Sequence, residues 1–86
     1  MKLIIAIIKD SDNDRVSNAL TEEKFRVTLI ASTGGFLRSG RSTLLIGTEN
    51  DRVSRAIEIL REATTQVKDE KRATVFVVNI EEYTQL

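Results

Sequence analysis

The sequence predicts an α+β fold in which four strands and two helices follow one another in the order β-α-β-β-α-β. Aliphatic runs near the two ends of the chain, residues 3–8 and 73–80, are typical of strands. Residues 12–23 and 53–63 instead place apolar side chains at the spacing of a helix. Two further apolar segments flank a Gly-rich stretch at 32–41. Together these patterns predict a small sheet accompanied by two helices.

The first strand and the first helix are predicted within residues 3–23. The run at 3–8 is apolar at every position, which suits a strand that is buried on both faces. Ser11 followed by Asp14 resembles a capping box, and acidic residues in a first turn suit the helix dipole. A helix is therefore expected over residues 12–23, with apolar side chains on one face: Val16, Ala19 and Leu20.

The middle of the chain predicts two strands joined by a loop. Residues 25–31 alternate with a period of two, which is typical of a strand. One face is expected to carry Phe25, Val27 and Leu29, and the other Arg26, Thr28 and Ile30. Residues 32–41 contain three of the four glycines and are expected to form a loop. A third strand follows at residues 42–47.

The second half of the chain predicts one more helix and one more strand. Residues 48–51 form a second box-like helix start, and residues 53–63 carry a regular apolar stripe. Residues 64–72 are polar and charged, so we expect a loop there, and residues 68–72 are most simply a solvated charged loop. The last strand is expected at 73–80, before a polar tail at 81–86.

This order of elements is that of the ferredoxin-like fold, in which two helices cover one face of a four-stranded antiparallel sheet. The length of 86 residues indicates a single domain spanning residues 1–86. The second sheet face stays open, although the strands at 3–8 and 73–80 are apolar on both faces. Monomers rarely expose such a surface, so we expect a homo-oligomer packed through the open face. A loop or the C-terminal tail that covers this face is the alternative.

The composition argues against several kinds of chemistry. Without His and Cys, the chain has no His/Cys metal site, no Ser-His-Asp triad and no Cys-His dyad. Asp10, Asp12 and Asp14 lack the Gly and the terminal Glu of a calcium loop, and acids at a helix start explain them better. Because neither a general base nor a buried acid pair is evident, we expect a binding or signalling module that has no metal and no cofactor, and not an enzyme.

Charge and hydropathy address possible partners. Thirteen Lys and Arg residues balance thirteen Asp and Glu residues, which argues against nucleic-acid binding through bulk charge. The longest apolar run, residues 3–8, is too short to span a bilayer and lacks the cleavage site of a signal peptide. The expectation is therefore a cytoplasmic protein without membrane contact.

The Gly-rich stretch is the main candidate for a binding site. Adjacent glycines allow successive backbone N–H groups to face one anion, and Arg38 and Arg41 match the forked geometry of a phosphate. Phe36 offers a ring on which a base can stack. Arg26 and Thr28 share a strand face that leads toward this stretch, and Lys24 adds charge at the same rim. The alternative is that the stretch is only a strand-to-strand turn.

Several segments resemble the bacterial PII-like cyclic-di-AMP receptor family, which is itself similar to the PII signal transducers. The most specific is Thr-Gly-Gly-Phe-Leu-Arg at 33–38, followed by a small residue and Gly40. Ala-Thr-Val-Phe-Val at 73–77 is the second. The opening run at 1–8 and Phe-Arg-Val-Thr at 25–28 agree with the family as well, and the resemblance extends nearly from end to end.

The resemblance implies a ferredoxin-like homotrimer that binds three cyclic-di-AMP molecules at its subunit interfaces and signals to a downstream protein. The ligand-binding residues that the resemblance implies are Arg26, Thr28, Gly35, Phe36, Leu37, Gly47 and, from the tail, Gln85. The Gly-rich stretch adds its two arginines, Arg38 and Arg41. Family logic places Thr28 and the backbone around Gly35 and Leu37 against phosphates or base edges, with Phe36 stacking.

The sequence departs from the family pattern in two respects. Lys24 and Arg41 stand where family members tend to carry Asn, so two base-reading amides are replaced by cations. The family also has a long Gly- and Pro-rich loop before the last strand, whereas residues 64–72 are few, charged and free of both residue types. The chain is either a naturally short homologue or one whose loop has been replaced.

Three hypotheses follow from these observations. The first is a PII-like trimer that binds cyclic-di-AMP. The second keeps the fold but exchanges this ligand for another nucleotide such as ATP, because Lys24 and Arg41 favour a more anionic ligand. The third is an interaction module without a small-molecule ligand, in which the Gly-rich stretch is only a turn.

Overall fold

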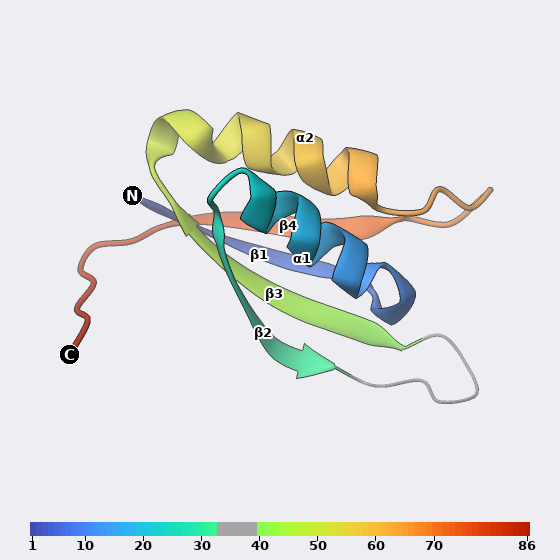
Figure 1. The fold of residues 1–86 in the computed structure, drawn as a ribbon, viewed down its shortest axis with the longest axis horizontal. Coiled ribbons are helices and arrows are strands. Elements are labelled where there is room, and N and C mark those ends of the chain that lie inside the picture. Colours follow the sequence, from blue (N-terminus) through green and yellow to red (C-terminus); the bar gives the residue numbers. More distant parts are fainter. Residues whose placement is uncertain (33–39) are drawn as a thin grey trace.

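The computed structural model describes residues 1–32 and 40–86 (Figure 1). Two single turns of 3-10 helix, Asp10–Asp12 and Asn50–Arg52, each lead directly into an α-helix. The principal elements follow in the predicted order: β1 (Lys2–Lys9), α1 (Asn13–Glu22), β2 (Arg26–Ser32), β3 (Arg41–Thr48), α2 (Val53–Ala63) and β4 (Ala73–Asn79).

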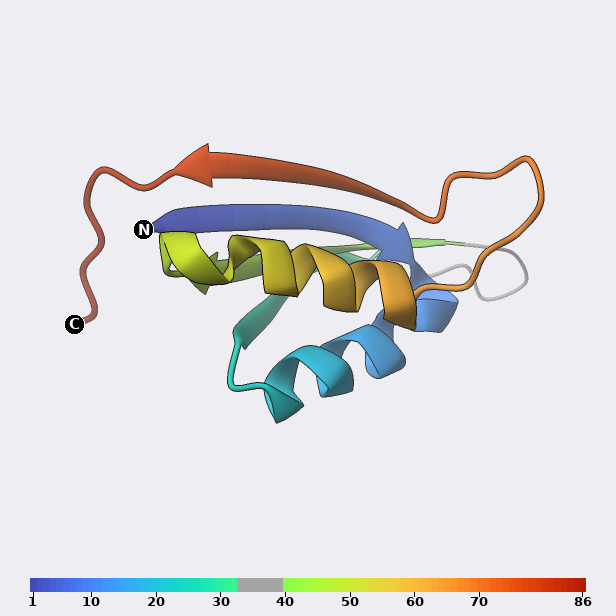
Figure 2. The same cartoon turned by 90° about the horizontal axis from the view of Figure 1, so that it is seen from above.

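The four strands form one antiparallel sheet in the order β2-β3-β1-β4. Both helices lie on the same side of this sheet, and the other side is left open (Figures 1 and 2). The predicted ferredoxin-like fold is therefore confirmed. Both ends of the chain lie beyond one end of the sheet, and the connection between α2 and β4 lies beyond the opposite end (Figure 1).

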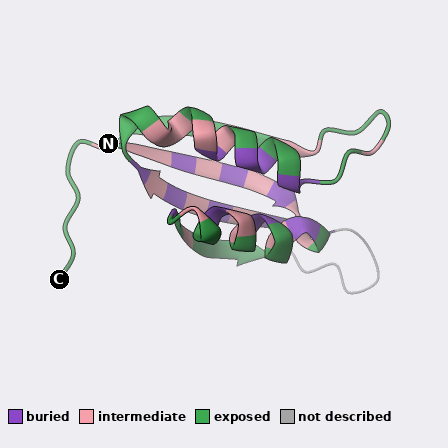
Figure 3. Ribbon diagram, turned by 45° about the horizontal axis from the view of Figure 1, so that its top comes forward, coloured by how far each residue is buried: buried purple, intermediate pink, exposed green. Residues whose placement is uncertain are grey.

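The core lies between the helices and the sheet. Along β1 and β3 every second side chain is buried against the helices, which gives the alternating bands visible in Figure 3. The helices complete this core with the apolar stripes that their sequences predict. The fully buried aliphatic side chains are Ile4, Ala6 and Ile8 of β1, Leu44 and Ile46 of β3, Val16 and Leu20 of α1, and Ala56 and Leu60 of α2.

The capping boxes predicted at the two helix starts are wrong. Neither α1 nor α2 has a side-chain hydrogen bond at its N-cap, which is Asp12 in α1 and Arg52 in α2. The chain enters each helix through the preceding 3-10 turn, whose tighter backbone bonds engage amide groups at the helix start. The predicted boundaries nevertheless differ from the observed ones by at most one residue.

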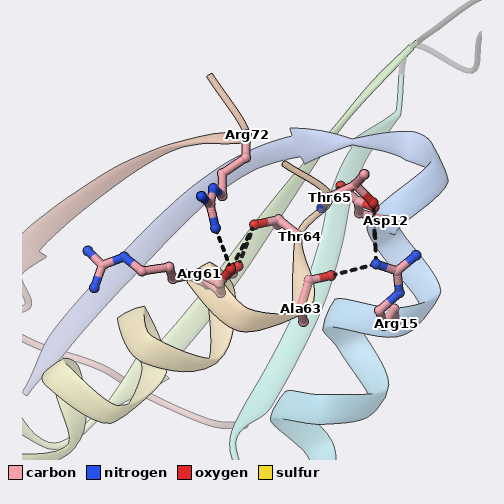
Figure 4. Close-up of polar contacts among 8 residues, drawn as sticks. Asp12, Arg15, Arg61, Ala63, Thr64, Thr65 and Arg72 are labelled. Carbon is pink, nitrogen blue, oxygen red and sulfur yellow. Dashed lines mark hydrogen bonds and ion pairs between the residues drawn. The ribbon is translucent and has the colours of Figure 1, made fainter. Parts of the chain in front are cut away.

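Asp10 and Asp12 lie at the helix start as predicted, and both also make hydrogen bonds to distant parts of the chain. Asp12 is fully buried and accepts hydrogen bonds from Thr65 N–H (3.0 Å) and Thr65 Oγ1 (2.7 Å). Arg15 Nη1 lies 3.7 Å from the same carboxylate and also donates to the carbonyl of Ala63 (3.3 Å). Asp12 therefore ties the start of α1 to the end of α2 (Figure 4).

The connection at 64–72 is a loop as predicted, with residues 68–71 exposed, and it is anchored at both ends. Thr64 is buried, and its Oγ1 donates to the carbonyl of Leu60 (2.7 Å). Arg72 Nη1 donates to the carbonyl of Arg61 (2.9 Å), as Figure 4 shows. These bonds engage carbonyls that the end of α2 leaves without helical partners, so both ends of the short connection are anchored.

The regular alternation predicted for residues 25–31 fails in its second half. The pairing of β2 with β3 shifts between Leu29 and Ala31, which indicates a β-bulge at Ile30. Phe25 is buried as predicted, but Leu29 and Ile30 are 48% and 53% exposed. A bulge re-aims the side chains that follow it, and the period-two pattern does not reveal one in advance.

The open face of the sheet is apolar along its central strand and along β4. Leu3, Ile5 and Ile7 of β1 point to this side, because their neighbours in the strand face the core. In β4, Phe76 and Val78 lie opposite Ile5 and Leu3, and are 51% and 42% exposed. Within residues 1–32 and 40–86, neither helix combines the length and the apolar character needed to cross a membrane.

Candidate functional site

A hollow of about 310 Å³ lies on the open face where β2 and β3 meet the C-terminal tail. It brings together side chains from both ends of the sequence. Four of its lining residues are predicted ligand contacts: Arg26, Thr28, Gly47 and Gln85. Met1, Leu3, Leu45, Ile80 and Tyr83 complete the wall, which is predominantly apolar.

The strand register explains why these residues meet. Arg26 pairs with Gly47, and Gly47 pairs with Leu3, so these three positions form one row across the sheet. Thr28 and Leu45 stand in the next row on the same face, because side chains two residues apart point the same way. A Cβ atom added at Gly47 would meet nothing within 4 Å. The absence of a side chain at this position therefore leaves the middle of the row open.

A second hollow, of about 290 Å³, adjoins the first at the end of the sheet where β2 begins and β3 ends. Arg26 and Gly47 line both hollows, together with Met1 and Tyr83. The second hollow is bordered by Lys24 and Arg52 and by the carboxylate of Glu49. Its lining is therefore more cationic than that of the first hollow.

Local structure fixes the side chain of Arg52 and the backbone of Lys24. The Arg52 guanidinium lies 4.0 Å from the centroid of the Phe25 ring, and its Nη2 donates to the carbonyl of Glu23 (2.8 Å). Lys24 has a φ of 69°, a left-handed conformation that closes the turn between α1 and β2. The backbone N–H of Lys24 donates to Thr21 (2.9 Å) in this turn.

Asp10 joins the three strand ends around the Gly-rich stretch. Ser32 Oγ donates to Asp10 Oδ1 (2.8 Å), and Ser42 Oγ donates to the same oxygen. The backbone N–H of Asp10 donates to the carbonyl of Gly40 (3.0 Å). Ser32 is the last residue of β2, and Ser42 is the second residue of β3. One carboxylate just after β1 therefore binds the strand residues on either side of residues 33–39.

The remaining predicted contacts are Arg41 and four residues of the Gly-rich stretch. Gly35, Phe36, Leu37 and Arg38 lie outside the described residues. Arg41 is exposed at the first position of β3, six residues before Gly47. At the rise of an extended strand, that separation is about 20 Å. Arg41 and the hollow at Gly47 therefore lie at opposite ends of the β2–β3 pair.

Sequence reasoning missed three features of this region. Arg52 was assigned no role, because its sequence position at a helix start gives no sign of its stacking on Phe25. No sequence pattern around Tyr83 points to a binding role either, although Tyr83 lines both hollows. Asp10 was predicted to serve a helix dipole. Each contact depends on the tertiary fold, and only the short hydroxyl-rich flanks at Ser32 and Ser42 hint at a partner.

The geometry suits the binding of a polar ligand with apolar parts. Arg26 offers a forked cation, Thr28 a hydroxyl, and Gln85 an amide that both donates and accepts. The apolar wall formed by the other lining residues suits a base or a sugar face. Among the described residues, no group of three or more acidic side chains is placed to hold a metal ion.

Comparison with known proteins identifies the family of this chain. A family model described as cyclic-di-AMP receptor matches residues 1–72, which include the sheet from β1 to β3 and both helices. A solved structure of a functionally unknown protein from Pediococcus pentosaceus is 32% identical, with a TM-score of 0.79. The alignment covers 99% of this chain and 96% of that one. The chain belongs to the cyclic-di-AMP receptor family.

Proposed function

We propose that this chain is a PII-like signalling protein that binds cyclic-di-AMP at the subunit interfaces of a homotrimer. The observation that carries the proposal is the hollow at the β2–β3 edge. The fold brings Arg26, Thr28, Gly47 and Gln85 to this one place from three separate parts of the sequence. Membership of a cyclic-di-AMP receptor family supports the choice of ligand.

Each group at the hollow has a role that fits a cyclic dinucleotide. Arg26 pairs with a phosphodiester, because a guanidinium donates two parallel hydrogen bonds to neighbouring phosphate oxygens. Thr28 donates to the same phosphate or to a base edge. The bare backbone of Gly47 leaves room for the ligand to lie against β3. The amide of Gln85 matches the adjacent donor and acceptor of an adenine edge.

The size of the hollow supports an interface site. Its volume of about 310 Å³ is at the lower end of the range for ligand pockets, and one side is open. A second wall is therefore needed to enclose a dinucleotide. The separation of about 20 Å between Arg41 and Gly47 agrees with this arrangement. Arg41 and the Gly-rich stretch of one subunit would reach the hollow of the next.

The open sheet face supplies a surface for trimerisation. Phe76 and Val78 are half exposed on the same face as Leu3, Ile5 and Ile7. Burial of such a surface between subunits is favourable at about 25 cal/mol per Å² of apolar area. The same face also carries the hollow, so packing through it brings neighbouring subunits to the ligand.

A receptor role fits the side chains at the hollows better than an enzymatic one. Glu49 is the sole carboxylate among the described residues that line them, so the lining offers no acid pair for proton transfer. The output would then be a change in contact with a downstream protein. We place this protein in the cytoplasm, where it would sense a soluble nucleotide.

Titration calorimetry with cyclic-di-AMP, together with light scattering for the mass, tests the proposal. We expect saturable binding near one ligand per chain and the mass of a trimer. ATP and cyclic-di-GMP serve as matched ligands and should bind more weakly. A trimer that prefers ATP would favour a different nucleotide as the ligand. A protein that ignores all three nucleotides at high micromolar concentration would favour an interaction module.

A further inference from the structure

The second hollow has an unusual balance of charge. Three cationic side chains border it, those of Lys24, Arg26 and Arg52, against the single carboxylate of Glu49. Within residues 1–32 and 40–86, none of these three cations lies within 4.0 Å of a carboxylate oxygen. Their charges are therefore available to an anion that enters the hollow.

The fold positions the backbone of these three residues before any ligand arrives, and it also fixes the side chain of Arg52. Arg52 is clamped between the Phe25 ring and the carbonyl of Glu23. Lys24 stands at a closed turn, and Arg26 is the first residue of β2. A site assembled in this way binds an anion without first ordering its backbone, which lowers the entropic cost of binding.

The cationic hollow is continuous with the proposed ligand site. Arg26 and Gly47 form part of the lining of both hollows. The first is mostly apolar, and the second is mostly cationic. A ligand that places a base against the apolar wall can therefore extend a charged end past Arg26 into the second hollow.

We infer that the second hollow is a subsite for the terminal phosphate of a linear dinucleotide. The inference rests on the proposed function, because it assumes that the nucleotide body occupies the first hollow. Its subject is the ligand class: the site would accept the linear dinucleotide pApA as well as, or better than, the cyclic form.

The chemistry of the two ligands explains the preference. Water adds across one phosphodiester of cyclic-di-AMP: one P–O bond breaks, the phosphorus gains the hydroxyl and the sugar oxygen gains the proton. The product, pApA, keeps one phosphodiester and gains a terminal phosphate. That phosphate carries a charge of about −1.5 to −2 at neutral pH. The two phosphodiesters of the cyclic form carry one charge each and are part of the ring, so the cyclic form has no terminal phosphate to place in the second hollow.

Calorimetric titrations with pApA and ApA test the inference, because ApA is the same linear dinucleotide without the terminal phosphate. We expect the wild-type protein to bind pApA about tenfold more tightly than ApA, the size of one charge-assisted contact. The advantage should shrink as salt is raised, since partly exposed charges are screened. Equal affinities for pApA and ApA would overturn the inference.

The variant Lys24→Asn removes one cation and keeps the turn, because Asn tolerates a left-handed backbone. It should reduce the advantage of pApA over ApA several-fold, because only pApA has a terminal phosphate for Lys24 to contact. Lys68→Asn is the matched control, an exposed lysine in the connection at the opposite end of the sheet. An equal loss for both ligands in Lys24→Asn would contradict the inference.

Cyclic-di-AMP, titrated in parallel, separates the two proposals. If cyclic-di-AMP binds but pApA shows no advantage over ApA, the subsite is refuted and the proposed function stands. If pApA binds with the expected advantage but cyclic-di-AMP does not bind, the subsite stands and the cyclic ligand is refuted. Failure of pApA to bind refutes the subsite whatever cyclic-di-AMP does.

Discussion

Asp12 shows how one side chain can stabilise this small fold. Burial alone raises the pKa of its carboxyl group, but the hydrogen bonds from Thr65 and the charges of Arg15 and Lys9 outweigh this effect. The pKa therefore lies below its ordinary value. A carboxylate with a lowered pKa stabilises the folded state at neutral pH, and this contribution is lost as the pH falls through the folded-state pKa.

The variant Asp12→Asn should lower the free energy of unfolding at neutral pH by about 1–3 kcal/mol. Its amide keeps the size of the side chain but loses the charge and one of the acceptors facing Thr65. Urea denaturation across a pH series measures the effect. The gap between wild type and variant should narrow from neutral pH toward acid. Asp14→Asn, an exposed acid of α1, is the control, and a constant gap would contradict this account.

At the scale of residues, the sequence indicated which residues line the hollow better than it indicated which residues contact one another. Arg26, Thr28, Gly47 and Gln85 were named through a family resemblance, and the structure gathers all four at one hollow. The bond of Asp12 to Thr65 joins residues 53 positions apart. No local pattern encodes such a contact, because it depends on how α1 and α2 pack together.

At the scale of elements, the strands and helices were predictable because their apolar spacing is dictated by the core. The burial of side chains alternates along β1 and β3, as a sheet covered on one face requires. The helix α2 carries the expected apolar stripe. The bulge in β2 and the two 3-10 turns were not predicted. These features alter the backbone only locally, so they leave the spacing of apolar residues almost unchanged.

The junction of β1, β2 and β3 at Asp10 leads to a prediction about the Gly-rich stretch. Asp10→Ala removes the carboxylate that accepts hydrogen bonds from the hydroxyls of Ser32 and Ser42, which flank this stretch. If the stretch contacts the ligand, cyclic-di-AMP should bind several-fold more weakly, by about one hydrogen bond's worth of energy. Calorimetry measures the change. Asp14→Ala should bind like wild type, and unchanged binding in Asp10→Ala would show that the junction does not serve the ligand.

At the scale of the whole molecule, the open sheet face predicts a trimer that one charge can dissociate. Phe76→Lys places an ammonium group in the centre of the apolar face, where its desolvation disfavours association. Val77→Lys is the matched control, because Val77 pairs with the buried Ile4 and so points to the other face. Sedimentation should show monomers for the first variant and trimers for the second. Trimers in both variants would place the interface elsewhere.

The assembly itself lay partly beyond the reach of the sequence. Apolar residues on both faces of β1 and β4 indicated that the open face needs a partner, and the structure shows that face bare in the single chain. The arrangement of neighbouring subunits depends on complementary surfaces, which a linear pattern does not describe. The site shares this dependence, since its proposed second wall belongs to a neighbour.

The most direct test of the central claim is a titration of cyclic-di-AMP into the wild-type protein and the Gly47→Val variant side by side. Valine suits a strand, and the space above Gly47 holds no atom within 4 Å of an added Cβ, so the variant should fold and assemble normally. Its side chain would fill the floor of the hollow. The account predicts that the wild type binds and that the variant loses about tenfold or more in affinity. Equal binding by the two proteins, with assembly unchanged, would place the ligand elsewhere and contradict the account.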